Sequence, residues 1–177
     1  MNKTAADDKN NKCAVVGVMS DSHYDLNAVD DAVCAAGDVD CWFHAGDSID
    51  DAGYLEKLSD VKDYKVPGNV DWFSDAPPDL LAEVAGLRIF MTHGHRYGVK
   101  FSLDKLKMAA KAVNADIVIY GHSHVGAQEY ADGRLFINPG SVSEPRDGLS
   151  SSFMKIIIIN GKISVNRIFL NNKHDKF

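Results

Sequence analysis

The chain has 177 residues, a length that fits one domain with a single hydrophobic core. Its composition, 45% hydrophobic and 25% charged, is ordinary for a globular protein, and no apolar run approaches the roughly 20 residues of a membrane span. The formal net charge of −6 gives no general attraction to nucleic acid. These properties argue against a membrane protein and against a sequence-specific nucleic-acid binder.

The two ends of the chain are polar. Residues 1–12 lack the apolar stretch of a secretory signal, so we expect a disordered N-terminal tail on a cytoplasmic protein. Residues 171–177, which include His174, form a polar C-terminal tail, and residues 13–170 are predicted to form a single domain. The cysteines show no paired spacing and are expected to be buried free thiols: Cys13, Cys34 and Cys41.

In the first half of the chain, apolar runs alternate with helical periodicity. A buried strand is predicted at 13–19, and a helix begins near Leu26. Further strands are predicted at 39–44 and 61–66, with a helix at 52–58 between them. This alternation predicts a βαβα arrangement with a largely parallel sheet.

The second half is rich in hairpin signals. Asp132-Gly133 and Asn160-Gly161 each predict a two-residue hairpin turn. The other predicted elements are a hairpin, a helix and a short buried strand, at residues 80–85 with 87–92, 102–113 and 117–120. The two halves together predict an α/β fold in which two mixed sheets pack together with helices outside.

Histidine, aspartate and asparagine residues follow directly after several predicted strands. They are Asp21 and His23, Asp47, Asn69, His93 and His95, and His122 and His124. Since the carboxyl ends of strands form the ligand crevice of α/β sheets, we expect these segments to converge.

Their chemistry indicates a metal site. Two ligands separated by one residue in extended chain project to the same side, as in Asp21-Ser-His23 and His122-Ser-His124. Carboxylate oxygen and imidazole nitrogen suit borderline divalent cations, and a carboxylate such as Asp47 has two oxygens that can bridge two of them. Mn²⁺ is our first expectation, and Ni²⁺, Fe²⁺, Zn²⁺ and Mg²⁺ are alternatives.

The order of these motifs resembles the calcineurin-like metallophosphoesterase superfamily over residues 13–170. The matching segments are Asp21-Ser-His23, Gly46-Asp47, Gly68-Asn69, His93-Gly-His95 and Gly121-His-Ser-His124. The segments Gly68-Asn69-Val-Asp71 and Asn138-Pro-Gly-Ser141 resemble the small bacterial and archaeal phosphodiesterase branch, which is related to the retromer scaffold subunit. The resemblance implies a four-layer αββα sandwich of two mixed β-sheets flanked by helices.

The resemblance also implies two metal sites that share one ligand. The first would be held by Asp21, His23, Asp47 and His124, and the second by Asp47, Asn69, His93 and His122. Many members carry a histidine after the Gly-Asn pair that protonates the leaving group, but this chain has Val70 there. Asp71, His95 and metal-bound water are therefore the candidate proton donors.

The function implied is a dinuclear-metal-dependent phosphodiesterase, in which metal-bound hydroxide attacks the phosphorus of a small phosphodiester or nucleotide-type substrate. The alternatives are a non-catalytic, metal-binding interaction scaffold of the same fold, and a phosphomonoesterase or protein phosphatase. The complete ligand set favours an enzyme. Exposed strand edges in the hairpin-rich half are compatible with a homodimer or a higher homo-oligomer.

Several neighbouring residues have two readings. Arg146 would hold a substrate phosphate or pair with Glu144. Trp72 and Phe73 would flank an aromatic leaving group or, as the preferred interpretation, pack within their own loop. Residues 138–141 are expected to form a tight turn at the rim of the site, and His44 to have a structural role. Asp25 is expected to cap a helix, and Asp50 and Asp51 to have no part in metal binding.

Overall fold

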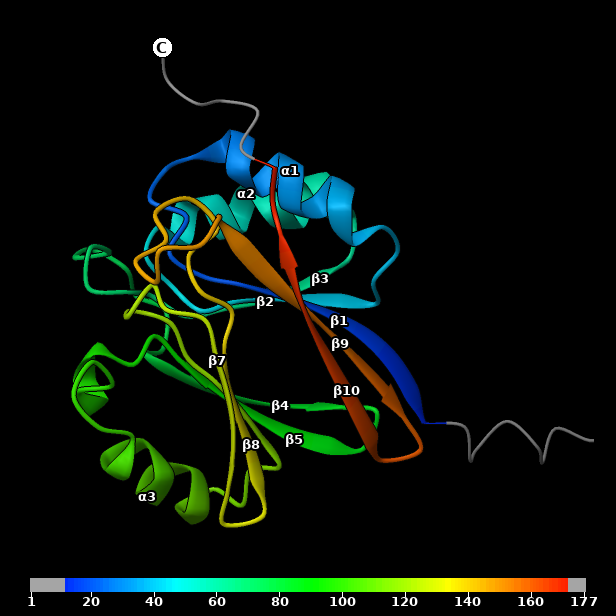
Figure 1. The fold of residues 1–177 in the computed structure, drawn as a ribbon, viewed down its shortest axis with the longest axis vertical. Coiled ribbons are helices and arrows are strands. Elements are labelled where there is room, and N and C mark those ends of the chain that lie inside the picture. Colours follow the sequence, from blue (N-terminus) through cyan, green and yellow to red (C-terminus); the bar gives the residue numbers. More distant parts are fainter. Residues whose placement is uncertain (1–11, 172–177) are drawn as a thin grey trace, which may run out of the picture.

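The computed structural model describes residues 12–171, which form two stacked five-stranded sheets (Figure 1). Apart from Lys12 and Asn171, the predicted tails lie outside the described residues, as does His174. The helices are α1 (Leu26–Ala36), α2 (Ile49–Ser59) and α3 (Asp104–Ala112), with a short 3-10 helix η1 (His95–Tyr97). The strands are β1 (Cys13–Met19), β2 (Cys41–His44), β3 (Lys62–Lys65), β4 (Asp79–Val84), β5 (Leu87–Thr92), β6 (Ile117–Ile119), β7 (Ala127–Ala131), β8 (Arg134–Asn138), β9 (Ser152–Ile159) and β10 (Lys162–Phe169).

The first sheet has the strand order β10-β9-β1-β2-β3. Its strands β1, β2 and β3 are parallel, as the alternation of strand and helix signals predicts. The antiparallel hairpin β9–β10 completes the sheet. Its turn has positive φ at both Asn160 (51°) and Gly161 (79°), the type I′ geometry that an Asn-Gly pair favours.

The second sheet has the order β4-β5-β6-β8-β7. Strands β5, β6 and β8 are parallel, whereas β4 and β7 run antiparallel at the two edges. The hairpins β4–β5 and β7–β8 turn at Ala85-Gly86 and Asp132-Gly133, where both residues of each pair have positive φ. The predicted hairpins are therefore confirmed.

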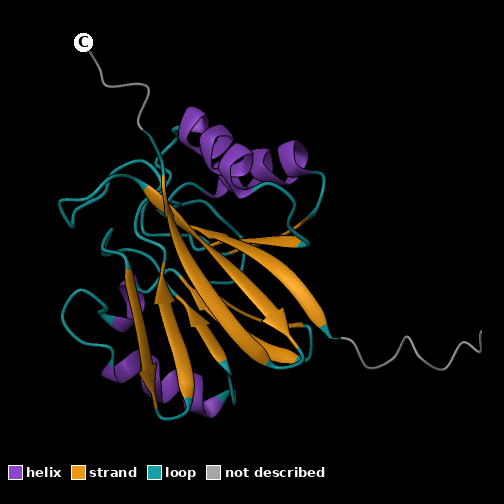
Figure 2. Ribbon diagram, turned by 45° about the vertical axis from the view of Figure 1, so that its right-hand side comes forward, coloured by secondary structure: helices purple, strands orange, loops and turns teal. Residues whose placement is uncertain are grey.

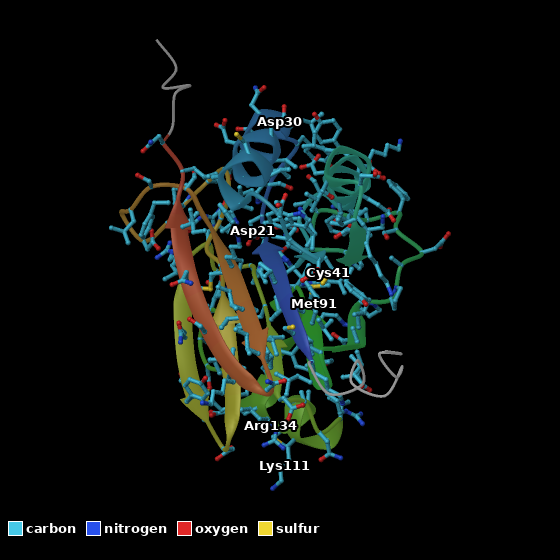
Figure 3. All side chains as sticks on the ribbon, turned by 90° about the vertical axis from the view of Figure 1, so that its right-hand side faces the viewer. Asp21, Asp30, Cys41, Met91, Lys111 and Arg134 are labelled. Carbon is cyan, nitrogen blue, oxygen red and sulfur yellow. The ribbon has the colours of Figure 1, made fainter. Side chains whose placement is uncertain are left out.

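The sheets pack face to face, and helices cover both outer faces (Figure 2). Side chains from both sheets, among them Cys41 and Met91, fill the layer between them (Figure 3). Along β2 the side chains alternate, so that Phe43 enters this layer while Trp42 packs beneath α1 and α2. Helix α3 covers the second sheet with an apolar face that includes Leu106. This arrangement confirms the four-layer αββα sandwich.

The structure corrects one prediction about packing. Only Cys41 is buried among the three cysteines, whereas Cys13 and Cys34 are exposed. Cys13 is the first residue of β1, and Cys34 lies on the outer face of α1, away from the buried residues of that helix such as Ala32. Within residues 12–171, no helix combines the length and the apolar character needed to cross a membrane.

Candidate metal centre

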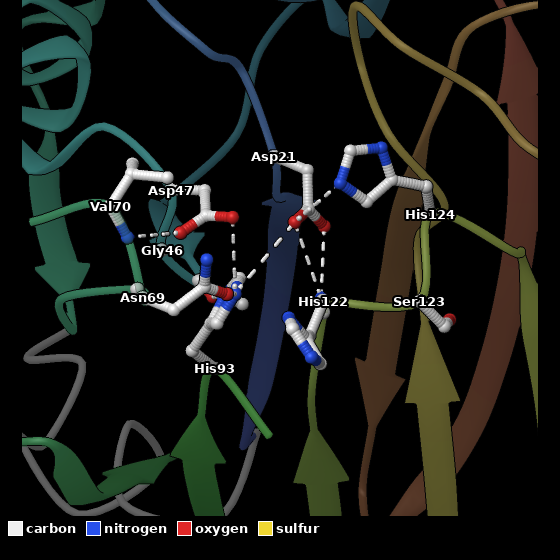
Figure 4. Close-up of polar contacts among 12 residues, drawn as sticks. Asp21, Gly46, Asp47, Asn69, Val70, His93, His122, Ser123 and His124 are labelled. Atoms are coloured by element: carbon white, nitrogen blue, oxygen red, sulfur yellow. Dashed lines mark hydrogen bonds and ion pairs between the residues drawn. The ribbon is translucent and has the colours of Figure 1, made fainter. Parts of the chain in front are cut away.

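All seven predicted ligands lie at the carboxyl ends of strands, where the two sheets meet. The loops after β1, β2 and β3 in the first sheet and after β5 and β6 in the second sheet carry them. Apart from His23, which is not labelled there, the close-up in Figure 4 shows these residues gathered around Asp21 and Asp47. The convergence expected from the strand-end pattern is therefore present.

The first group contains Asp21, His23, Asp47 and His124, whose ligand atoms all lie within 4.8 Å of one another. The Nε2 atom of His124 is 3.3 Å from Oδ1 of Asp21. The Nε2 atom of His23 is 3.2 Å from Nε2 of His124 and 3.6 Å from Oδ2 of Asp47. This group matches the first set implied by the family resemblance.

The second group contains Asp47, His93 and His122, again with ligand atoms within 4.8 Å of one another. The Nε2 atom of His93 is 3.3 Å from Oδ2 of Asp47 and 3.2 Å from Oδ1 of Asn69. Asp47 thus belongs to both groups, and the amide oxygen of Asn69 is directed into the second one. The two groups form one continuous cluster around a shared carboxylate.

Two histidine rings are oriented by backbone carbonyl groups. Nδ1 of His93 donates to the carbonyl oxygen of Ala45 at 2.7 Å, and Nδ1 of His124 donates to that of Glu144 at 2.6 Å. With the proton on Nδ1, each neutral ring presents the lone pair of Nε2 to the cluster. Such a second hydrogen bond is the usual way to fix a metal-binding histidine.

The cluster is an assembly of electron-pair donors that faces inward. Nε2 of His93 meets oxygens of both Asp47 and Asn69, and the Nε2 atoms of His23 and His124 face each other. Lone pairs brought this close repel unless a proton or a cation lies between them. Oxygen and imidazole nitrogen are the donor set of borderline divalent cations, so the residues fit the metal pair that the resemblance implies.

The members of the cluster differ in how readily they carry charge. Burial raises the pKa of Asp47, but hydrogen bonds from His93 and from the Val70 nitrogen, together with the charges of His93 and His23, outweigh burial and lower the pKa to about 2. Burial lowers the pKa of His93 and His124, yet hydrogen bonding and the charges of nearby aspartates outweigh it and raise the pKa of both. For His122, burial and the neighbouring His93 lower the pKa to about 4.

The backbone is strained at most of the ligand positions. Five of the seven have positive φ: Asp21 (56°), His23 (48°), Asp47 (56°), His122 (67°) and His124 (58°). Non-glycine residues in this region cost about 1–3 kcal/mol each and persist where the surrounding structure holds them. The fold therefore holds these five residues in an unfavourable backbone conformation. The sequence pattern does not indicate this strain.

One glycine beside the ligands is required by the packing of the loops. The Cβ of any other residue at Gly68 would overlap the Asp47 carboxylate and backbone nitrogen. The loop after β3 can therefore approach the shared carboxylate closely, and the backbone nitrogen of Val70 donates to Oδ1 of Asp47 at 3.2 Å.

The segment from Asn138 to Ser141 lies beneath the ligand loops, not at the rim as predicted, and both of these residues are fully buried. Nδ2 of Asn138 donates to the carbonyl oxygen of Gly121 at 2.9 Å, and Oγ of Ser141 donates to that of Asp21 at 2.7 Å. The reason for the difference is that the strained ligand loops leave carbonyl groups inside the protein that need donors. The segment holds two ligand loops in place.

The two predicted proton donors have different surroundings. The Asp71 carboxylate accepts from the backbone nitrogen of Ile49 at 2.9 Å and from that of Gly68 at 2.7 Å. The His95 ring stands beside the second group, with its centroid 5.4 Å from that of His93 and 5.9 Å from that of His122. Burial lowers the pKa of His95, and its Nδ1 is buried without a hydrogen-bond partner among the described residues.

The other residues singled out in the sequence are also placed. Asp25 caps α1 by accepting from the backbone nitrogen of Ala28, as predicted. His44 is fully buried and lies 3.0 Å from Oγ of Ser22, in keeping with a structural role. Asp50 and Asp51 belong to α2 and to neither ligand group.

The structure distinguishes between the two interpretations given for Arg146 and for the pair Trp72 and Phe73. Arg146 makes no side-chain ion pair with Glu144 or any other residue in the range 12–171. Trp72 and Phe73 are 85% and 100% exposed, so the interpretation that they pack within their loop is wrong. They are the two central residues of a turn closed by a hydrogen bond from the nitrogen of Ser74 to the oxygen of Asp71, which directs both rings outward.

A four-layer αββα sandwich with histidine and aspartate groups at its strand ends is the architecture of a metallophosphoesterase. The chain belongs to the calcineurin-like phosphoesterase superfamily, whose domain matches residues 15–160. A probable metallophosphoesterase of Bacillus subtilis is 33% identical over 153 residues, covering 84% of this chain and 86% of that protein. A phosphodiesterase of Methanocaldococcus jannaschii is 30% identical over 149 residues, covering 71% and 82%.

Solved structures show the same fold. A predicted phosphoesterase from Streptococcus pneumoniae superimposes with a TM-score of 0.77 at 30% identity, covering 91% of this chain and 94% of that one. Vps29 from Entamoeba histolytica superimposes with a TM-score of 0.67 at 20% identity, covering 89% and 99%. The likeness to Vps29 concerns the fold alone.

Proposed function

We propose that this protein hydrolyses phosphodiesters with the help of two divalent cations. The cations would be held by the two ligand groups described above, with Asn69 completing the second. The observation that carries the proposal is that Asp47 belongs to both groups, because one shared carboxylate brings two cations next to each other. The phosphodiesterase name of the relative from Methanocaldococcus jannaschii supports the choice of a diester.

When bound, such a pair of cations supplies a water nucleophile ionised at neutral pH and neutralises charge on the transferring phosphate. The protein's own contribution is to fix the ligands before substrate arrives. The carbonyl groups of Ala45 and Glu144 orient two imidazole rings, and the nitrogen of Val70 orients the shared carboxylate. This rigidity lowers the cost of assembling the site during the reaction.

Of the two side chains among the candidate proton donors, His95 is the better placed to act on the leaving group. Both oxygens of Asp71 already accept hydrogen bonds from the backbone, so this residue holds the loop that carries Asn69. His95 lies beside the second ligand group, and burial keeps its ring neutral at pH 7 by lowering its pKa. In this proposal the N–H of the neutral ring donates a hydrogen bond that stabilises negative charge on the departing oxygen, and that oxygen takes its proton from water.

Arg146 is assigned to the substrate phosphate. Its backbone nitrogen donates to the carbonyl oxygen of His124 at 3.0 Å, so the residue sits next to the first ligand group. Its guanidinium has no ion-pair partner in the described part of the chain. A planar cation with five donors suits the non-bridging oxygens of a phosphate.

The second candidate function is a non-catalytic interaction scaffold. The fold shared with Vps29 suggests this candidate, since one fold can have several functions. The ligand set distinguishes the two. A scaffold has no need of strained backbone at five ligand positions, yet this chain maintains it. We therefore place the enzyme first.

The test is an assay of purified protein from which metals have been removed. Mn²⁺, Ni²⁺, Fe²⁺, Zn²⁺ and Mg²⁺ are restored separately, with Mn²⁺ as the first choice. The substrates are bis(p-nitrophenyl) phosphate, p-nitrophenyl phosphate and a phosphoserine peptide. We expect metal-dependent cleavage of the diester at the highest kcat/KM. Faster cleavage of the monoester or the peptide would contradict a diesterase, and metal binding without cleavage of any of them would favour the scaffold.

A further inference from the structure

The three most exposed large hydrophobic side chains of the described chain lie in the loops that carry metal-ligand residues or directly follow them. Trp72, Phe73 and Phe101 are 85%, 100% and 95% exposed. Trp72 and Phe73 follow Asn69 in the loop after β3, and Phe101 follows His93 and η1 after β5. We call these three side chains the aromatic rim. Their placement beside the metal centre requires an explanation, since each ring leaves roughly 150–250 Å² of mostly apolar surface in water.

The turn that carries Trp72 and Phe73 is fixed to the metal centre. Asp71 begins the turn, and its carboxylate accepts from the nitrogens of Gly68 and Ile49 at 2.7 and 2.9 Å. Ser74 closes the turn through its nitrogen, which donates to the oxygen of Asp71 at 3.2 Å. The two rings therefore project from a rigid base next to Asn69.

The segment that carries Phe101 lies beside this loop. Asp79, where the loop enters β4, pairs with Thr92 in β5, the residue before His93. Oη of Tyr97 in η1 donates to Oδ2 of Asp79 at 2.8 Å and ties the two segments together. Figure 1 shows both segments at the end of the sheets where the ligand loops gather. The rim residues thus lie on two adjoining segments, one of which carries Asn69 while the other follows His93.

The surroundings of the rings favour a small planar ligand over a protein partner. Trp72 and Phe73 have the polar neighbours Asp71 and Ser74, and Phe101 stands between Lys100 and Ser102. The core of a protein interface is a continuous patch depleted in charged residues. Exposed aromatic rings flanked by polar residues, beside a site suited to phosphate, instead resemble the platforms on which bases stack.

We propose that the aromatic rim binds the planar organic group of the substrate, such as a nucleobase, while the metal centre holds its phosphate. This inference rests on the proposed phosphodiesterase function and narrows its substrate to esters with an aromatic or nucleobase group. Stacking of a base on an aromatic side chain is worth roughly 1–3 kcal/mol, so removal of one ring should weaken binding by about 5-fold or more.

The test compares two probes that differ only in the base. Adenosine 5′-monophosphate and ribose 5-phosphate are titrated into the metal-loaded protein by calorimetry. We expect the nucleotide to bind about 5-fold or more tightly than the sugar phosphate. In Trp72→Ala and Phe73→Ala this preference should shrink toward 1, while the affinity for ribose 5-phosphate stays the same. Tyr130→Ala, at a 64% exposed ring on β7, is the matched control and should keep the preference.

The fluorescence of the protein gives an independent readout. The chain has two tryptophans, of which Trp42 is fully buried and Trp72 is 85% exposed. Adenosine 5′-monophosphate should therefore quench the emission of Trp72, and Trp72→Phe should abolish the quenching. Ribose 5-phosphate should leave the emission unchanged in both proteins.

The outcomes separate the rim from the metal centre. If ribose 5-phosphate binds and adenine adds no affinity, the rim proposal is wrong while the proposed catalysis stands. If sedimentation shows a wild-type dimer that Trp72→Ala converts to a monomer, the rim is an interface between two copies of the chain and the proposal is overturned. If the metal-loaded protein binds neither probe and cleaves no diester, the proposed function fails and the rim proposal fails with it.

Discussion

At the scale of single residues, Asp47 has the most connections within the site. Its Oδ2 lies 3.3 Å from Nε2 of His93 and 3.6 Å from Nε2 of His23, one residue from each ligand group. Its Oδ1 accepts from the backbone nitrogen of Val70. A change at this side chain therefore affects both halves of the site at once.

Asp47→Asn tests this shared role. The amide cannot bridge two cations with two negative oxygens, so we expect lower metal content and a loss of diester hydrolysis of more than roughly 100-fold, since even outer-shell changes at metal sites cost about 10- to 100-fold. Metal analysis and kcat/KM measure the two effects. Asp50→Asn, an exposed position in the first turn of α2, is the control and should retain both. Full metal content and full activity in Asp47→Asn would refute the bridging role.

The buried side chain of His44 should make the stability of the folded protein depend on pH. Burial lowers its pKa from 6.5 to about 4, so the folded protein keeps it neutral while the unfolded chain binds a proton below pH 6.5. Its contribution to stability is therefore lost as the pH falls from 6.5 toward 4, and the full shift corresponds to roughly 3 kcal/mol.

In metal-free protein, the free energy of unfolding should fall by about 2 kcal/mol less in His44→Gln than in wild type between pH 6.5 and 4.5. Urea denaturation at both pH values measures this difference. An identical pH dependence in the two proteins would show that His44 does not titrate in this window.

The sequence could predict that these Asp, Asn and His side chains converge, but it could not predict how each one is oriented. Asp, Asn and His after strands leave a visible pattern, as Asp21 and His93 illustrate. The carbonyl groups of Ala45 and Glu144 that orient the histidines are backbone atoms, which every residue has. The exposure of Trp72 could not be predicted from the sequence either, because it depends on the conformation of the four-residue turn that directs the ring outward.

At the scale of elements, the strands and hairpins followed their local signals closely. The pairs Asn160-Gly161 and Asp132-Gly133 predict the observed turns because they tolerate positive φ. Boundaries were less accurate, and β2 begins at Cys41, not at Val39. The backbone nitrogen of Asp40 donates to the carbonyl oxygen of Val15 instead, a connection between distant segments that local sequence does not reveal.

Two glycine substitutions should have opposite effects on stability. Gly161 has a φ of 79°, so Gly161→Ala should destabilise the protein by about 1–2 kcal/mol although no atom crowds the position. Gly53 lies within α2 with open space around it, so Gly53→Ala should stabilise the protein by about 0.5–1 kcal/mol. Urea denaturation of both variants measures the effects. A stabilising Gly161→Ala would contradict the turn geometry, and a destabilising Gly53→Ala would contradict the open helical position.

At the scale of the whole molecule, the site exists because two sheets bring their parallel strands to one edge. The first sheet supplies Asp21, Asp47 and Asn69, and the second supplies His93 and the pair after β6. Neither sheet alone contains a complete candidate group, since each of the two groups that could hold a cation draws on both sheets. The order of the predicted elements indicates two packed sheets with helices outside, and the resemblance to a known family implies the same four-layer arrangement.

This arrangement also defines what distinguishes an enzyme from a scaffold in this fold. A scaffold requires the outer surface of the sandwich, whereas the proposed catalysis requires both ligand groups to be filled at once. Activity should therefore depend on the second cation and not on the first alone.

The most direct measurement is the initial rate of bis(p-nitrophenyl) phosphate hydrolysis as metal-free protein is titrated with Mn²⁺, with bound metal determined in the same samples. We predict little activity up to one bound equivalent and a steep rise as the second binds. Full activity at one equivalent, or no hydrolysis with both equivalents bound, would contradict a two-cation phosphodiesterase.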